Sequence, residues 1–157
     1  MSGDSAIHAA AARRPLEVAD LLGCWKLVDA FEERDGVVLP NPYVGRNATG
    51  YLHYLAGGRV AVAVALAGRQ PMSGSDRRKA PAAELAQSAL TFDAYAGTFS
   101  LLGADRIAHH IEISTYQNQV GTDLVRRVVL EDGLLSLFPE LPPDEHPRWL
   151  VWRRIAA

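Results

Sequence analysis

The chain has 157 residues, a formal net charge of −2 and 22% charged residues. This length suits one domain with a sizeable core, and no shift in composition indicates a second. Lys and Arg occur in short pairs rather than along one stripe, which argues against nucleic acid as a partner. No stretch approaches the ~20 continuous apolar residues of a membrane helix, so we expect no membrane insertion.

The N-terminal segment differs from the rest of the chain. Residues 1–14 are rich in Ala, Ser and Gly without an apolar period, which predicts a mobile arm before an ordered domain over 15–157. Arg13 and Arg14 follow the alanine run instead of preceding it, so we expect no signal peptide. Cys24 is the one cysteine, so no internal disulfide can form, which fits a cytoplasmic location.

A short helix is predicted from Pro15 to the residue before Gly23. A second and longer helix is predicted over 81–91, where good helix formers follow Pro81, and we expect it to lie across one mouth of the fold. The remaining segments have the alternation and turn signals of strands. They cover residues 24–33, 37–39, 50–55, 59–66, 95–101, 106–115, 123–131, 134–138 and 148–155.

Short strands joined by tight turns predict an all-β fold. Successive hairpins without a long return connection favour an eight- to nine-stranded antiparallel up-and-down barrel, because neighbours in sequence can pair all the way round and closure removes exposed edges. An eight-stranded ring is wide enough for packed side chains or for one small ligand.

Six short motifs carry a resemblance to a known family: Gly23–Val28, Gly50–Tyr54, Gly57–Arg59, His109–Glu112, Val120–Thr122 and Leu150–Trp152. From about Asp20 to Arg154 the sequence resembles the lipocalin-like domain family of small bacterial and fungal proteins. The resemblance implies a barrel that binds a hydrophobic small molecule, and for most members no defined reaction. Some calycin-like barrels are cyclases or isomerases of natural-product pathways, which is an analogy at the level of the fold.

Strand alternation separates the adjacent histidines. The apolar phase of 106–114 contains His109 together with three isoleucines, so His109 is predicted inside the barrel and His110 outside. The two rings therefore cannot grip one metal ion. His110 shares its face with Glu112, but two ligands without a third make a poor zinc site, and we expect no metal.

The same period gives a candidate ligand site. Its predicted inward residues are Asp29, His109, Arg126, Tyr54, Tyr95, Phe99 and Trp25. A mostly apolar cavity with a few converging polar groups is typical of small-molecule sites. Small residues placed at or near the inner face, Ala61, Ala63, Ala65 and Gly97, are expected to leave room for the ligand.

Several of these residues have a structural alternative. Asp29 and Arg126 could neutralise each other as a buried pair. In lipocalins proper the tryptophan of this motif packs beneath an arginine of a late strand, so Trp25 with Arg126 or Arg153 could plug the closed end instead of touching a ligand. His109 is either a satisfied core histidine or a catalytic one.

Two main functions remain open. The first is a cofactor-independent cyclase, isomerase or (de)hydratase of secondary metabolism, with Asp29 and His109 moving protons while Arg126 or Tyr54 holds an oxygen of a lipophilic substrate. The second is a non-catalytic carrier or sequestering protein. A purely structural role would require an inner face packed solid. No phosphate loop, nucleophile elbow or zinc spacing occurs, so no cofactor is expected. A homodimer is left open.

Overall fold

The computed structural model describes residues 13–157. Most of the arm predicted over 1–14 therefore lies outside the described residues. Its last two residues are described, and both make ion pairs: Arg13 with Glu131, and Arg14 with Asp20.

Residues 13–157 contain nine strands and two α-helices. The helices are α1 (Val18–Leu21) and α2 (Ala82–Leu90), and short 3₁₀ turns, η1 (Arg77–Lys79) and η2 (Gln117–Gln119), lie in two loops. The strands are β1 (Gly23–Arg34), β2 (Val37–Pro40), β3 (Thr49–Leu55), β4 (Arg59–Ala65), β5 (Phe92–Leu102), β6 (Arg106–Ser114), β7 (Asp123–Glu131), β8 (Leu134–Pro139) and β9 (Arg148–Ala156).

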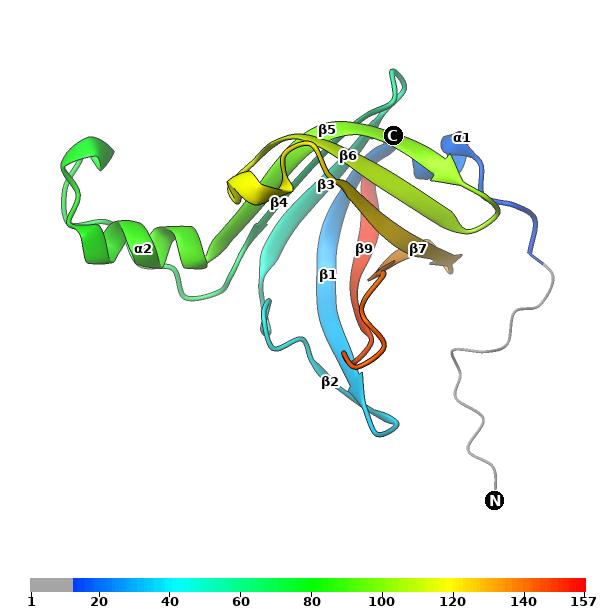
Figure 1. Cartoon of the computed structure of the whole chain (residues 1–157), viewed down its shortest axis with the longest axis horizontal. Helices are drawn as coiled ribbons and strands as arrows, with labels where there is room; N and C mark the ends of the chain where they lie inside the picture. The colour runs from blue at the N-terminus through cyan, green and yellow to red at the C-terminus, as the bar shows by residue number, and fades with distance from the viewer. Residues whose placement is uncertain (1–12) are drawn as a thin grey trace.

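The strands close into an antiparallel barrel. From β3 to β9 each strand pairs with the next in sequence, β1 pairs with β3, and pairing of β9 with β1 closes the ring. Strand β2 pairs with the far end of β1 and extends beyond the ring (Figure 1). The predicted up-and-down barrel is confirmed, and closure leaves the eight strands of the ring without a free edge.

A bulge in β1 reverses its side-chain alternation. Leu27 lies opposite Trp152 and Asp29 opposite Val151, so Val28 is an extra residue. Before the bulge Trp25 and Leu27 are buried, whereas after it Ala30 and Glu32 are buried. Asp29 thus takes the opposite phase to Trp25 and Leu27. The sequence-based placement of Asp29 on their face is wrong, because an inserted residue changes the phase of a strand.

The small residues predicted near the inner face lie elsewhere. In β4 the core contacts come from Val60, Val62 and Val64, so the alanines at 61, 63 and 65 belong to the outer phase. A Cβ atom added to Gly97 would lie 1.8 Å from the carbonyl oxygen of His110. Gly97 therefore permits a close approach of β5 and β6 at their bulge and does not create space for a ligand.

Helix α2 is present over nearly the predicted residues, but it extends away from the barrel beyond β4 and β5 instead of crossing a mouth (Figure 1). None of its residues is buried, and Leu90 at its end is 78% exposed. In the part of the chain that the structure describes, no helix has both the length and the apolar character of a membrane span.

Candidate functional site

Three polar side chains meet inside the barrel. His109 on β6 is fully buried, the Tyr54 hydroxyl from β3 lies 2.7 Å from its Nε2, and the Tyr95 hydroxyl from β5 lies 2.8 Å from its Nδ1. We call this set the Tyr–His–Tyr chain. Because both ring nitrogens have a partner, the imidazole is satisfied within an otherwise apolar core.

Aromatic packing holds the side chains of the Tyr–His–Tyr chain in place. The Tyr54 ring meets Phe99 edge-on, with ring centroids 4.8 Å apart, and Phe99 lies directly opposite His109 in the pairing of β5 with β6. Tyr54 and Tyr95 also pack on the imidazole, at centroid separations of 5.5 and 5.8 Å. Four side chains predicted to face inward are therefore brought together.

Burial keeps all three polar groups uncharged. It lowers the pKa of His109 to about 3, with smaller contributions in the same direction from Arg126 and His110. Burial raises the pKa of Tyr95 to about 12, and it raises the pKa of Tyr54 well above its ordinary value. At neutral pH the imidazole and both phenols are therefore neutral.

Arg126 lies close to the Tyr–His–Tyr chain. It occupies β7 between Ile107 of β6 and Pro139 of β8, and its positive charge lowers the pKa of Tyr54, Tyr95 and His109. Its side chain is half-buried, and Nη1 donates to the carbonyl of Val125 at 3.1 Å.

Asp29 makes no hydrogen bond or ion pair with Arg126 or with the Tyr–His–Tyr chain among the described residues. Its Oδ1 accepts the backbone N–H of Ala30 at 2.9 Å. The ion pairs formed by residues 13–157 do not include the pair of Asp29 with Arg126 that the sequence left open.

The closed end is built around Trp25. Its side chain is 1% exposed, and Nε1 donates to the carbonyl of Leu21 at 2.7 Å. The Arg154 guanidinium lies 4.5 Å from the centre of the Trp25 rings and donates to the carbonyls of Leu22 and Asp20. The plug therefore uses Arg154, and neither Arg126 nor Arg153. The extra residue Val28 sets this register, in which Trp25 lies opposite Arg154, and a second irregularity, with Ile155 of β9 as the extra residue, ends it.

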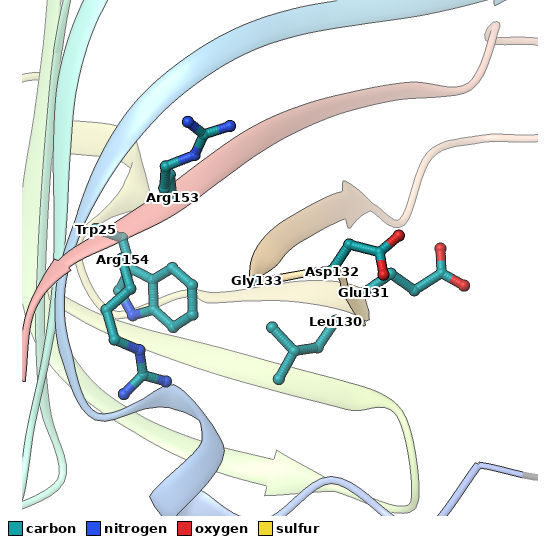
Figure 2. Close-up of a pocket in the computed structure, with 7 residues that line it drawn as sticks. All are labelled: Trp25, Leu130, Glu131, Asp132, Gly133, Arg153 and Arg154. Atoms are coloured by element: carbon teal, nitrogen blue, oxygen red, sulfur yellow. The ribbon is translucent and has the colours of Figure 1, made fainter.

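Two hollows lie beside these residues, one next to Trp25 and Arg154 and the other next to Tyr95. One of about 520 Å³ lies at the closed end and is lined by Trp25, Leu130, Glu131, Asp132, Gly133, Arg153 and Arg154. Figure 2 shows Leu130 pointing toward the Trp25 ring while the carboxylates of Glu131 and Asp132 point away from it. A second hollow of about 340 Å³ is lined by Ala94, Tyr95, Ala96, Ile113, Ser114 and Thr115. Tyr95 thus joins the Tyr–His–Tyr chain to a hollow.

A family model described as a lipocalin-like domain matches residues 22–155. The chain belongs to the lipocalin-like domain family. Crystal structures of two mutants of the fluorescent protein UnaG are similar to it, at 12% and 13% sequence identity and TM-scores of 0.40 and 0.42. The alignments cover 90% and 88% of this chain and 100% and 98% of those chains. Comparison with curated proteins gives no match.

On the outer face of this lipocalin-like barrel, His110 has partners of its own. Its Nδ1 lies 2.6 Å from the carboxylate of Asp123 and its Nε2 lies 2.8 Å from the hydroxyl of Ser100. Glu112 pairs with Arg59. His110 and Glu112 therefore have separate partners on the outer face.

Sequence reasoning missed two residues of the lipocalin-like interior, Arg154 and Trp152. Trp152 is 2% exposed and lies opposite the buried Leu27 and Leu135. Alternation in β9 carried a usable signal for it, because Leu150 and Trp152 fall in one phase. Arg154 falls in the same phase, but its place over Trp25 depends on the bulge in β1.

Because the His109 imidazole is buried, we expect the stability of this lipocalin-like domain to fall at acidic pH. Above the ordinary histidine pKa of 6.5, His109 is neutral in both the folded and the unfolded state. Below that pH the unfolded chain binds a proton that the folded chain does not, until the pH reaches about 3. The free energy of unfolding should therefore fall by about 1.4 kcal/mol for each pH unit from this group.

The measurement is a set of urea unfolding curves between neutral and mildly acidic pH for the wild type and for His109→Phe. The variant is expected to be less stable at neutral pH, because two tyrosine hydroxyls lose their partner. Its stability should, however, decline less steeply with falling pH. Parallel pH profiles for the two proteins would contradict the buried neutral state of His109.

Proposed function

We propose that the barrel binds one lipophilic small molecule in its interior and promotes a cofactor-independent cyclisation, isomerisation, or addition or loss of water. The Tyr–His–Tyr chain is the observation that carries the proposal. Buried polar groups lower stability relative to apolar packing unless they are fully hydrogen-bonded, and such groups in an apolar interior are typical of ligand sites. Membership of the lipocalin-like domain family agrees with a binding role.

Tyr95 is the member of the chain that we expect to touch the ligand, since it also lines a hollow. Both nitrogens of His109 are occupied by tyrosine hydroxyls, so His109 acts as a positioning residue that orients Tyr95. Asp29, which the sequence suggested as a second proton-transfer group, lies beyond the bulge of β1. We therefore assign the chemistry to Tyr95 and His109.

The pKa values indicate how this chemistry would work. Efficient general acids and bases have pKa values near the working pH, whereas His109 has a pKa of about 3 and Tyr95 a pKa of about 12. Full proton transfer is thus disfavoured, and the Tyr95 hydroxyl serves mainly to hold and polarise an oxygen of the substrate. Most of the acceleration would come from confining a flexible molecule in a reactive geometry.

A non-catalytic carrier or sequestering protein is the second candidate, and the same pKa values favour it. A neutral imidazole whose two nitrogens are already hydrogen-bonded forms a stable polar anchor that needs no reaction. The two candidates share the binding step and differ in whether the bound molecule is changed.

Binding is tested by titrating a fluorescent apolar probe, anilinonaphthalene sulfonate, into the protein and into Val62→Phe. Val62 belongs to the inner phase of β4, so a larger ring there should weaken binding about tenfold or more by occupying the interior. Ala61→Val, on the outer phase of the same strand, is the matched control and should bind as the wild type does. Weak, non-saturable binding by the wild type would contradict the proposal.

The enzyme and the carrier are then separated by mass spectrometry. Any small molecule extracted from the purified protein is returned to fresh protein, and the mixture is analysed by liquid chromatography over time. An isomer, or a product that differs by one water, would support the enzyme. An unchanged molecule would support the carrier.

A further inference from the structure

The barrel interior offers hydrogen-bond donors that lack protein acceptors. Among residues 13–157, one buried side-chain nitrogen or oxygen atom has no hydrogen-bond partner, and it is Nε1 of Trp152. An indole N–H can donate but cannot accept. Since Trp152 is buried opposite Leu27 and Leu135 of the core, only an acceptor brought into the interior could satisfy it.

The Tyr–His–Tyr chain leaves a second donor. A neutral imidazole has one N–H, so it donates to one tyrosine and accepts from the other. The tyrosine that receives the imidazole N–H must then use its own hydroxyl proton elsewhere. Tyr54 is 1% exposed, and His109 is the one partner of its hydroxyl among the described residues.

A buried donor without a partner is costly, so Tyr54 donates to Nε2 of His109. The ring therefore carries its proton on Nδ1 and donates it to the oxygen of Tyr95. The hydroxyl proton of Tyr95 remains for another acceptor. Tyr95 is less buried than Tyr54 and lines a hollow, so a ligand can reach it.

Arg126 supplies the positive charge. Of its five N–H donors, the structure gives one a partner, the carbonyl of Val125. None of the ion pairs formed by residues 13–157 includes Arg126. Two acidic side chains of the barrel are engaged with other arginines: Glu32 pairs with Arg34, and Glu140 pairs with Arg106.

We infer that the ligand carries a carboxylate, which the guanidinium of Arg126 and the hydroxyl of Tyr95 bind, while its apolar body fills the barrel. This inference rests on the proposed function and names the chemical class of its ligand. A guanidinium fork matches a carboxylate in shape and charge, whereas a neutral carbonyl would leave the charge of Arg126 uncompensated. A phosphate dianion would exceed the one positive charge at this place. Trp152 N–H offers a further donor to an oxygen on the body of the ligand.

The test compares two probes with the same fluorophore and alkyl chain, dansylaminoundecanoic acid and its uncharged methyl ester, by fluorescence titration. The wild type is expected to bind the acid about 10- to 100-fold more tightly than the ester, as hydrogen bonds to a charged group imply. Arg126→Met should abolish this preference with little effect on the ester. Tyr95→Phe should weaken acid binding about 3- to 10-fold.

Arg127→Met is the matched control, because Arg127 is the next residue of β7 and lies over the Phe138 ring, 4.3 Å from its centroid. It should keep the preference for the acid. Equal affinity of the wild type for acid and ester, or an undiminished preference in a folded Arg126→Met, would overturn the carboxylate inference alone. Failure of both probes to bind saturably would overturn the proposed binding function as well. The comparison of probes in the wild type needs no variant to fold.

Discussion

Trp25→Ala is expected to lower the free energy of unfolding by about 3 to 5 kcal/mol, the range for removing a large buried aromatic side chain. The ring is almost completely buried, its N–H donates to Leu21, and Arg154 covers its face. Truncation would therefore remove apolar contacts, leave the carbonyl of Leu21 without this donor, and deprive Arg154 of its aromatic partner.

Urea unfolding followed by far-ultraviolet circular dichroism measures the effect. Val28→Ala serves as the control, because Val28 lies in the same strand but is half exposed at the bulge. Its cost should stay within about 0.5 kcal/mol. Similar stability of Trp25→Ala and Val28→Ala would contradict the claim that Trp25 stabilises the closed end as its plug.

Gly97→Ala is expected to cost more than about 3 kcal/mol, above the usual range for overpacking. The added Cβ would lie 1.8 Å from the carbonyl oxygen of His110, and a backbone atom cannot move aside as a flexible side chain can. Strands β5 and β6 would have to separate where they place Tyr95, Phe99 and His109. A substitution at Gly97 therefore tests the pairing of these strands rather than the space for a ligand.

Thermal unfolding of Gly97→Ala beside Gly57→Ala isolates this effect. A Cβ at Gly57 would meet nothing within 4 Å, so the control should unfold close to the wild-type temperature. If both variants unfolded together near that temperature, the close approach of β5 and β6 would be refuted.

Part of the interior could be predicted because side chains alternate regularly over parts of the sheet, as they do along β3. In β6, His109 shares a phase with the buried Ile107 and Ile111, and this placed the histidine inside. The same rule, applied to neighbouring strands, predicted that Tyr54 and Tyr95 also face inward, and the structure brings both hydroxyls to His109. A period of two is reliable where the sheet is regular, because each residue then has one fixed partner on either side.

The errors come from bulges and from short apolar side chains. The bulge at Val28 turned Asp29 away from the phase of Trp25, and the same bulge set the register that places Arg154 over the tryptophan. A bulge is one inserted residue, and the alternation on either side of it still appears intact in the sequence. In β4, valines and alanines alternate, and both types are apolar enough for either face.

Native mass spectrometry of the freshly purified protein tests the central claim, that the barrel holds one lipophilic molecule per chain. The predicted spectrum contains the polypeptide with one bound small molecule, and Val62→Phe, with its interior filled, should show this complex strongly reduced. A wild-type spectrum containing the bare polypeptide alone, both as purified and after incubation with dansylaminoundecanoic acid, would contradict it.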